Sequence, residues 1–133
     1  MAGGAIVDMR NQISKPNSTV PTDFERRQID RQVQNFLLNV VPVNYRGPGE
    51  VRFSAEQWTV ELFEVQAHPV HRQRGVRLPL ALLRSDGRGQ PWQLFFRGEQ
   101  GHWREYPVTD KQPFLRLEAA LAEIESDKYR VFW

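Results

Sequence analysis

The chain has no cysteine among its 133 residues. That absence excludes a disulfide scaffold, a thiolate zinc site and a cysteine nucleophile. No uncharged run approaches the ~20 apolar residues that a membrane-spanning helix needs, so we expect no membrane partner. Asp8 and Arg10 fall where a secretory signal would keep its apolar stretch. We therefore expect a cytoplasmic protein.

Lysine is scarce as well: only three of the 18 basic residues are lysines, and the other 15 are arginines. The formal net charge of +2 is too small to indicate a polyanion partner by itself. The charge is unevenly distributed, however, because residues 68–104 hold seven arginines against Asp86 and Glu99. Arginine stacks on aromatic rings and forms paired hydrogen bonds with carboxylates or phosphates. This basic middle is the first candidate for a binding surface.

The motifs of common enzymes are also missing. No serine lies in a Gly-x-Ser-x-Gly elbow, and the Gly-Arg-Gly segment around Arg88 has the features of a hairpin turn rather than of a phosphate-binding loop. Glu61 and Glu64 lie three positions apart on a predicted strand, so they point to opposite faces and cannot flank one substrate bond. We expect no cofactor and favour a non-enzymatic protein. A small enzyme with a histidine-containing site stays as an alternative.

The first 21 residues form a flexible tail in our prediction, since glycine, proline, serine and asparagine interrupt any apolar period. One domain, residues 22–133, follows. It begins with a helix, because Thr22 and Glu25 have the spacing of a capping box and apolar residues then recur at helical intervals. Pro42 ends this helix.

After a Gly-Pro-Gly loop, the apolar period changes from helical to alternating. The pattern predicts strands over the ranges 51–54, 58–66, 78–84, 91–97 and 102–108. An Asp-Gly dipeptide is a hairpin signal between the third and the fourth of them. A helix over 114–126 and a final short strand over 129–133 complete the chain. This order predicts an α+β fold, an antiparallel β-meander of about five strands packed by an N-terminal and a C-terminal helix.

The last part of the chain carries a recurrent aromatic pattern. Its residues are Trp92, Phe95, Phe96 and Arg97, then Trp103, Tyr106 and Pro107, an acidic helix, and Phe132-Trp133. The pattern resembles a small bacterial family of unknown function, and residues 61–65 are similar to an earlier strand of that family. The family usually has Asp and Lys shortly before the second Trp, where this chain has Gln100 and His102. The resemblance covers 58–133 and implies a domain of unknown function, without a chemistry.

Three histidines are the candidates for a metal site. His68 and His71 are close enough in sequence to chelate one metal ion, and His102, far along the chain, is a third candidate ligand. Because the pair lies in a loop with Pro69 inside it, we interpret all three as solvated side chains and predict no metal.

The predicted meander interleaves aromatic residues with arginines, as surfaces that bind single-stranded nucleic acid do. We infer an Arg-rich sheet surface for an anionic ligand, with nucleic acid as the leading example. Its candidate residues are Arg72, Arg74, Arg77, Arg88, Arg97 and Arg104, with Phe95 and Tyr106 as stacking surfaces. The alternative is that the aromatic residues fill the core. On the predicted strand, Trp92, Leu94 and Phe96 share one side, whereas Phe95 and Arg97 share the other.

Phe132 and Trp133 close the sequence with two large apolar side chains. Such a tryptophan either docks into its own core or contacts a partner, where tryptophan is a favoured anchor. The alternation of Tyr129, Val131 and Trp133 favours docking. A protein-interaction module or a homodimer is therefore the second candidate function.

Overall fold

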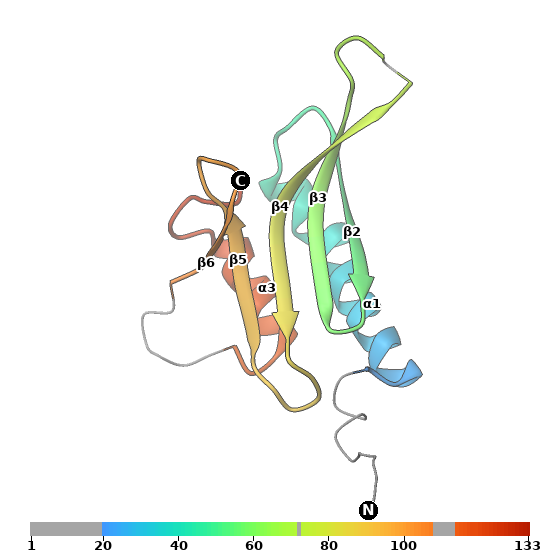
Figure 1. Ribbon diagram of the computed structural model, residues 1–133, viewed down its shortest axis with the longest axis vertical. Helices are drawn as coiled ribbons and strands as arrows, with labels where there is room; N and C mark the ends of the chain where they lie inside the picture. Colours follow the sequence, from blue (N-terminus) through green and yellow to red (C-terminus); the bar gives the residue numbers. More distant parts are fainter. Residues whose placement is uncertain (1–19, 72, 108–113) are drawn as a thin grey trace, which may run out of the picture.

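The computed structural model describes residues 20–71, 73–107 and 114–133. Its helices are α1 (Asp23–Asn39), α2 (Val41–Asn44) and α3 (Leu117–Ser126). Its strands are β2 (Glu50–Glu56), β3 (Thr59–Ala67), β4 (Gly75–Ser85), β5 (Trp92–Arg97) and β6 (Trp103–Glu105). All five strands belong to one antiparallel sheet in the order β2-β3-β4-β5-β6, so each strand pairs with its neighbours in sequence. The predicted α+β meander is confirmed (Figure 1).

The helix α1 begins at the predicted cap. The Thr22 hydroxyl accepts the Glu25 N–H at 3.1 Å, and the Glu25 carboxylate accepts the Thr22 N–H at 2.8 Å. These reciprocal bonds satisfy two backbone donors that the first helical turn leaves unpaired. The helix ends at Asn39, and Pro42 lies in the short helix α2 that follows.

The two long helices cover one face of the sheet, as Figure 1 shows. Ile29, Val33 and Phe36 of α1 and the apolar face of α3 pack against alternate residues of the central strands. The buried strand residues in this core are Val60, Leu62, Ala81, Leu83, Trp92 and Leu94. Within the described residues, the opposite face carries no helix, and we call it the open face.

The predicted strand over 129–133 is wrong. Asp127 ends α3 in the left-handed conformation, with φ of 43°, and its carboxylate accepts the N–H groups of Val131, Phe132 and Trp133. Backbone donors that a sheet would use are therefore satisfied by one side chain. The segment folds back on the core, where Phe132 is buried.

Other boundaries shift by a few residues. The tail predicted over 1–21 lies outside the described residues except at its end, where Pro21 is buried. The strand predicted over 102–108 is shorter and extends only over Trp103–Glu105, with position 108 outside the described residues. None of the helices in the described ranges is long and apolar enough to cross a membrane.

Candidate functional site

The candidate arginines do not form one patch, contrary to the single Arg-rich surface that we inferred. Arg74 lies near the β3–β4 turn, while Arg88 lies in the β4–β5 turn at the other end of these strands. Arg77 and Arg97 lie on strands, and Arg104 lies on β6. Arg72 is outside the described residues. The reason is geometric: successive turns of a meander lie at opposite ends of the sheet, and successive residues of a strand face opposite sides.

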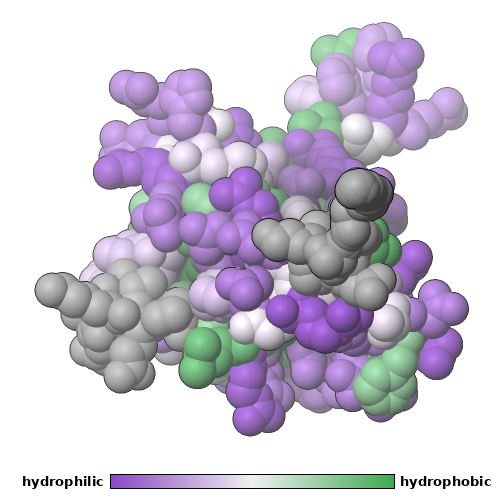
Figure 2. Space-filling view, turned by 60° about the horizontal axis from the view of Figure 1, so that its bottom comes forward, coloured by the Kyte–Doolittle hydropathy of each residue, from purple (hydrophilic) through white to green (hydrophobic). Residues whose placement is uncertain are grey.

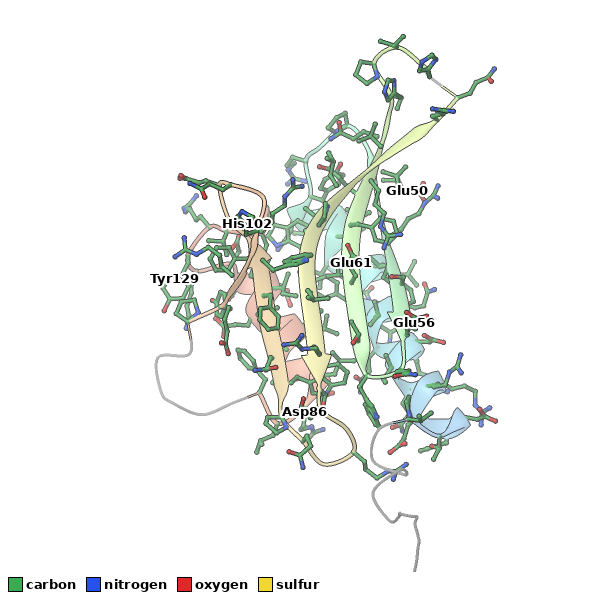
Figure 3. The ribbon with its side chains drawn as sticks, viewed as in Figure 1. Glu50, Glu56, Glu61, Asp86, His102 and Tyr129 are labelled. Carbon is green, nitrogen blue, oxygen red and sulfur yellow. The ribbon has the colours of Figure 1, made fainter. Side chains whose placement is uncertain are left out.

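Arg77 is held by its neighbours on the open face. Its guanidinium donates to the Glu61 carboxylate at 2.8 Å and lies 3.7 Å from the centre of the Phe63 ring. Glu61 lies in the middle of that face (Figure 3). Arg77 therefore neutralises an acid and covers an aromatic ring, which leaves it less available to an external anion.

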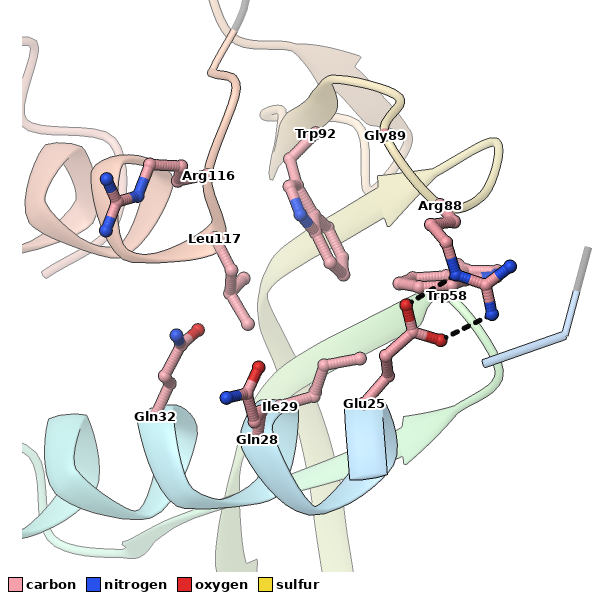
Figure 4. Close-up of a pocket in the computed structure, with 10 residues that line it drawn as sticks. All are labelled: Glu25, Gln28, Ile29, Gln32, Trp58, Arg88, Gly89, Trp92, Arg116 and Leu117. Carbon is pink, nitrogen blue, oxygen red and sulfur yellow. Dashed lines mark hydrogen bonds and ion pairs between the residues drawn. The ribbon is translucent and has the colours of Figure 1, made fainter. Parts of the chain in front are cut away.

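Arg88 is held by α1. Its guanidinium forms two hydrogen bonds with Glu25, from Nε at 2.7 Å and from Nη2 at 2.8 Å (Figure 4). These bonds, together with the Thr22 N–H, lower the pKa of Glu25 from 4.5 to about 2. The same bond raises the pKa of Arg88. The pair connects the β4–β5 turn to the first turn of α1, which is a structural role.

A cavity of about 380 Å³ adjoins this pair (Figure 4). It is lined by Glu25, Gln28, Ile29, Gln32, Trp58, Arg88, Gly89, Trp92, Arg116 and Leu117. The rings of Trp58 and Trp92 meet edge to face with centres 6.3 Å apart. Both arginines of the rim are paired, since Arg116 contacts Glu118 as Arg88 contacts Glu25. The cavity is consequently a poor site for an anion.

The part of the open face formed by β4, β5 and β6 carries arginines beside aromatic rings. Phe95 and Arg97 lie there, as the alternation of β5 predicts, because Leu94 on the other side is buried in the core. In β6, Trp103 is paired with Arg97 and is 37% exposed. The Arg84 guanidinium lies 5.0 Å from the centre of the Phe95 ring. Two aromatic rings and two guanidinium groups therefore share this area, which we call the β4–β6 platform (Phe95, Trp103, Arg84 and Arg97).

Arg97 extends over the turn that joins β5 to β6. A side-chain carbon at Gly101 would lie 3.2 Å from its Nη2, and Gly101 itself has φ of 81°. The left-handed conformation is what favours glycine here, because a side-chain carbon would displace only the flexible end of Arg97.

Arg84 and Trp103 were absent from our list of candidates. Arg84 follows Leu83 on a predicted strand, so alternation alone places it opposite the core. The position of Trp103 beside Arg97 depends on the β5–β6 register, which the Gly-Glu-Gln-Gly turn does not specify in the sequence.

Tyr106 and Arg104 lie on the helix side of the sheet, so the prediction of Tyr106 as a stacking surface is wrong. Tyr106 is 2% exposed, and its hydroxyl donates to the Glu123 carboxylate of α3 at 2.6 Å. Burial and the Glu123 hydrogen bond raise the pKa of Tyr106. Arg104 lies 5.9 Å from the centre of the Phe96 ring on that side. The alternation of β6 is responsible, because Trp103 and Glu105 take the open face.

The histidines do not converge. His68 and His71 lie at the β3–β4 turn with ring centres 5.2 Å apart, and His102 lies in the turn before β6 (Figure 3). In the described ranges, no group of three or more His, Asp or Glu side chains is placed to hold a metal ion.

Trp133 docks into its own domain. Its ring stacks on Phe36 of α1 with centres 6.4 Å apart, and its Nε1 donates to the Ile124 carbonyl at 2.9 Å. The more exposed hydrophobic residues are spread along the chain, at the two ends of α1 (Phe24 and Leu38), in α2 (Val43), in the β3–β4 turn (Val70) and before α3 (Leu115). On the face shown in Figure 2, hydrophilic residues separate the small hydrophobic areas from one another.

Together, the fold and the platform define a helix-backed antiparallel α+β domain whose open face carries arginine and aromatic side chains. Residues 21–133 match the model of a protein family described as Domain of unknown function (DUF3024), and the chain belongs to that family. This match confirms the resemblance to a family of unknown function. Neither a curated protein nor a solved structure matches the chain.

Proposed function

We propose that this domain is a non-enzymatic module that binds single-stranded nucleic acid on the β4–β6 platform. One observation carries the proposal: Phe95 and Trp103 lie on the open face beside Arg84 and Arg97. Within the described residues, neither arginine forms a salt bridge with a carboxylate. Arg84 contacts the neutral Gln93 amide oxygen at 3.5 Å and the Phe95 ring, so its charge is not neutralised, and we expect both guanidinium groups to bind phosphate.

The platform combines the two interactions that single-strand binding uses. Bases stack on aromatic rings, and each stacked base contributes ~1–3 kcal/mol. Arginine binds phosphate oxygens with paired hydrogen bonds. Phe95 and Trp103 are diagonal neighbours on adjacent strands, a relation that places side chains roughly 7–8 Å apart. Two rings at this spacing suit two neighbouring unstacked bases.

Acidic residues limit the extent of the surface. Glu105 is paired with Phe95 across β5 and β6, and Glu61 lies next to Arg77 in the centre of the sheet. Glu56 lies on the opposite edge strand, β2 (Figure 3). The favourable area is therefore confined to β4, β5 and the start of β6, which suits a short stretch of single strand.

The proposal includes a cytoplasmic location, where nucleic acid is accessible. A protein-interaction module or a homodimer remains the second candidate function. It is less well supported, because the Trp133 ring that would serve as an anchor is stacked on Phe36. Light scattering on the purified chain distinguishes a dimer from a monomer.

The test is a fluorescence anisotropy titration with a fluorescein-labelled 12-nucleotide single-stranded DNA. With two arginine–phosphate contacts, the affinity should fall about sevenfold between 50 and 200 mM salt, because bound counterions are released from the strand. The double variant Arg84→Gln/Arg97→Gln should bind about tenfold more weakly at low salt, a loss of about 1.4 kcal/mol.

The matched control is Arg26→Gln/Arg31→Gln, which removes the same charge from the exposed side of α1. It should change the affinity less than twofold. Equal losses in the two double variants would show that only net charge matters. That result, or a wild-type chain that does not bind at low salt, would overturn the proposal.

A further inference from the structure

The β3–β4 hairpin extends beyond the rest of the sheet. Pairing between β3 and β4 continues to Ala67 and Gly75, whereas β2 reaches only Val65 on β3. On the other side, β5 reaches only Ala81 on β4. Among the strands of the described residues, the end of the hairpin therefore pairs with no third strand, and Figure 1 shows it projecting past the body. We call it the hairpin arm (residues 66–71 and 73–76).

The turn at the end of the arm is organised by hydrogen bonds. His68 N–H donates to the Arg74 carbonyl at 2.9 Å, and Arg74 N–H donates to the His71 carbonyl at 2.9 Å. The Nδ1 atom of His68 accepts the N–H groups of Val70 and His71, at 3.1 and 2.9 Å. A side chain thus completes the turn, so the arm presents Pro69 and Val70 in a defined position.

Two apolar side chains, Pro69 and Val70, lie at the end of the arm between His68 and His71, and Arg74 supplies a positive charge beside them. Val70 is 76% exposed, and Pro69 beside it is also exposed. The sequence has no acidic residue between Glu64 and Asp86. Arg74 lies in the turn, directly before β4 begins at Gly75, and is exposed. The arm therefore carries two exposed apolar side chains and a guanidinium group on a narrow support that has no negative charge.

This combination matches the chemistry of the DNA minor groove. Proteins that bind there reach in with arginine and insert apolar residues, proline included, between base steps. A two-stranded ribbon is narrow enough to enter a groove of the duplex, and phosphates line the groove on both sides. A protein partner would not require the absence of acidic residues from the stretch 65–85.

We propose that the hairpin arm binds the minor groove of duplex DNA, with Pro69 and Val70 inserted against the base pairs and Arg74 contacting the adjacent phosphates. The inference shares the partner class of the proposed function but uses a different surface. A domain with both surfaces would bind at a junction between duplex and single strand. Each surface can therefore fail its test independently.

The experiment uses the full chain and two fluorescein-labelled probes, a 20-base-pair A·T-rich duplex and the 12-nucleotide single strand. The double variant Val70→Ser/Arg74→Gln should bind the duplex about tenfold more weakly, and its affinity for the single strand should change less than twofold. The platform variant Arg84→Gln/Arg97→Gln should show the opposite pattern.

The matched control is Val43→Ser/Arg46→Gln, which changes the same residue types near α2, where Val43 is 65% exposed. It should leave both affinities within twofold. Because the arm lies outside the core, the arm variant should keep the wild-type melting temperature, so a loss of binding cannot be attributed to unfolding.

Insertion has its own readout. Apolar insertion kinks a duplex, so energy transfer between dyes on the two duplex ends should rise when the wild-type chain binds and should not rise with Val70→Ser. Netropsin, which occupies the minor groove, should displace the chain. The proposal would be overturned if the wild-type chain did not bind the duplex, or if the arm variant kept the wild-type affinity for it. It would also be overturned if netropsin and Val70→Ser left duplex binding unchanged. Loss of single-strand binding alone would overturn only the proposed function.

Discussion

Glu25 should make the stability of this domain depend on pH in the acid range. Its carboxylate accepts hydrogen bonds from the Arg88 guanidinium and from the Thr22 N–H, and its pKa is lowered from 4.5 to about 2. The perturbation that we choose is Glu25→Gln. Glutamine keeps an acceptor for Thr22 and thus preserves the capping box, but it removes the charge that Arg88 binds.

The pKa shift, converted at about 1.4 kcal/mol per unit, corresponds to about 3 kcal/mol of stabilisation. That value is an upper bound, because the side chains of Arg88 and Glu25 are 43% and 23% exposed and water screens their attraction. We expect about 1 kcal/mol for Glu25→Gln at neutral pH, in the range of well-formed surface pairs. For a domain of this size, the melting temperature should fall by about 4 °C.

The direction of the pH effect follows from the lowered pKa. The folded state holds the ionised form of Glu25 more strongly, so its contribution is complete above pH 4.5 and is lost as the pH falls toward 2. Urea unfolding of the wild type and Glu25→Gln, measured from pH 7 to pH 2, should therefore converge at the acid end. Glu99→Gln, at an exposed turn residue, is the control and should match the wild type throughout. A difference between the wild type and Glu25→Gln that stays constant with pH would refute the reasoning.

Three further predictions concern the Tyr106–Glu123 bond between the sheet and α3, the C-terminal segment and the platform. Tyr106→Phe should lower the free energy of unfolding by about 1.5 kcal/mol, because it removes a hydrogen bond to the charged Glu123. Because the pKa of Tyr106 is raised, its neutral hydroxyl stabilises the fold at pH values below 10, and the wild type loses this stabilisation as the pH rises above 10. Tyr106→Phe should not show this loss. Chemical unfolding at pH 8 and pH 11 measures both effects. Trp133→Ala should cost about 2 kcal/mol in urea unfolding and Trp133→Phe less than about 1 kcal/mol, because phenylalanine keeps the contact with Phe36 and loses only the bond to Ile124. Equal costs would show that stacking on Phe36 contributes nothing. Glu105→Gln should strengthen binding of the single-stranded probe about threefold in the anisotropy titration, because it removes a negative charge that repels phosphate next to the platform. Weaker binding would argue against phosphate at that position.

Local signals in the sequence were enough to predict much of the fold. Thr22 and Glu25 form the capping box that their spacing predicts, and the Asp86-Gly87 turn joins β4 to β5. Both signals act over a few residues. The final strand was mispredicted because alternation in its sequence is compatible with a strand, while the Asp127 carboxylate binds the same backbone donors locally. Alternation describes which side chains are buried and does not specify where the backbone hydrogen bonds go.

The candidate site was harder to predict, since charges are neutralised by residues far away in the sequence. Arg88 is bound by Glu25, 63 positions earlier, and Arg77 by Glu61, 16 positions earlier. Counting arginines within 68–104 finds the excess of charge but not these partners. Tyr106 illustrates the same limit: its aromatic type suits a stacking surface, and only the register with β5 shows that it faces α3.

A bulge in β4, between the hairpin arm and the platform, explains how Arg77 and Arg84 both come to lie on the open face. Arg77 and Arg84 are seven residues apart, and in a regular strand an odd separation places side chains on opposite faces. The register shifts by one residue, however: Leu62 is paired with Ala81 and Phe63 with Pro79, so Leu80 has no partner on β3. The extra residue reverses the alternation, and both arginines reach the open face. Bulges also increase the local twist of a strand pair, which fits the way β4 crosses over β3 before the hairpin arm in Figure 1. Deleting Leu80 should therefore disturb the arm and the platform together, whereas substitutions within either surface should affect only one.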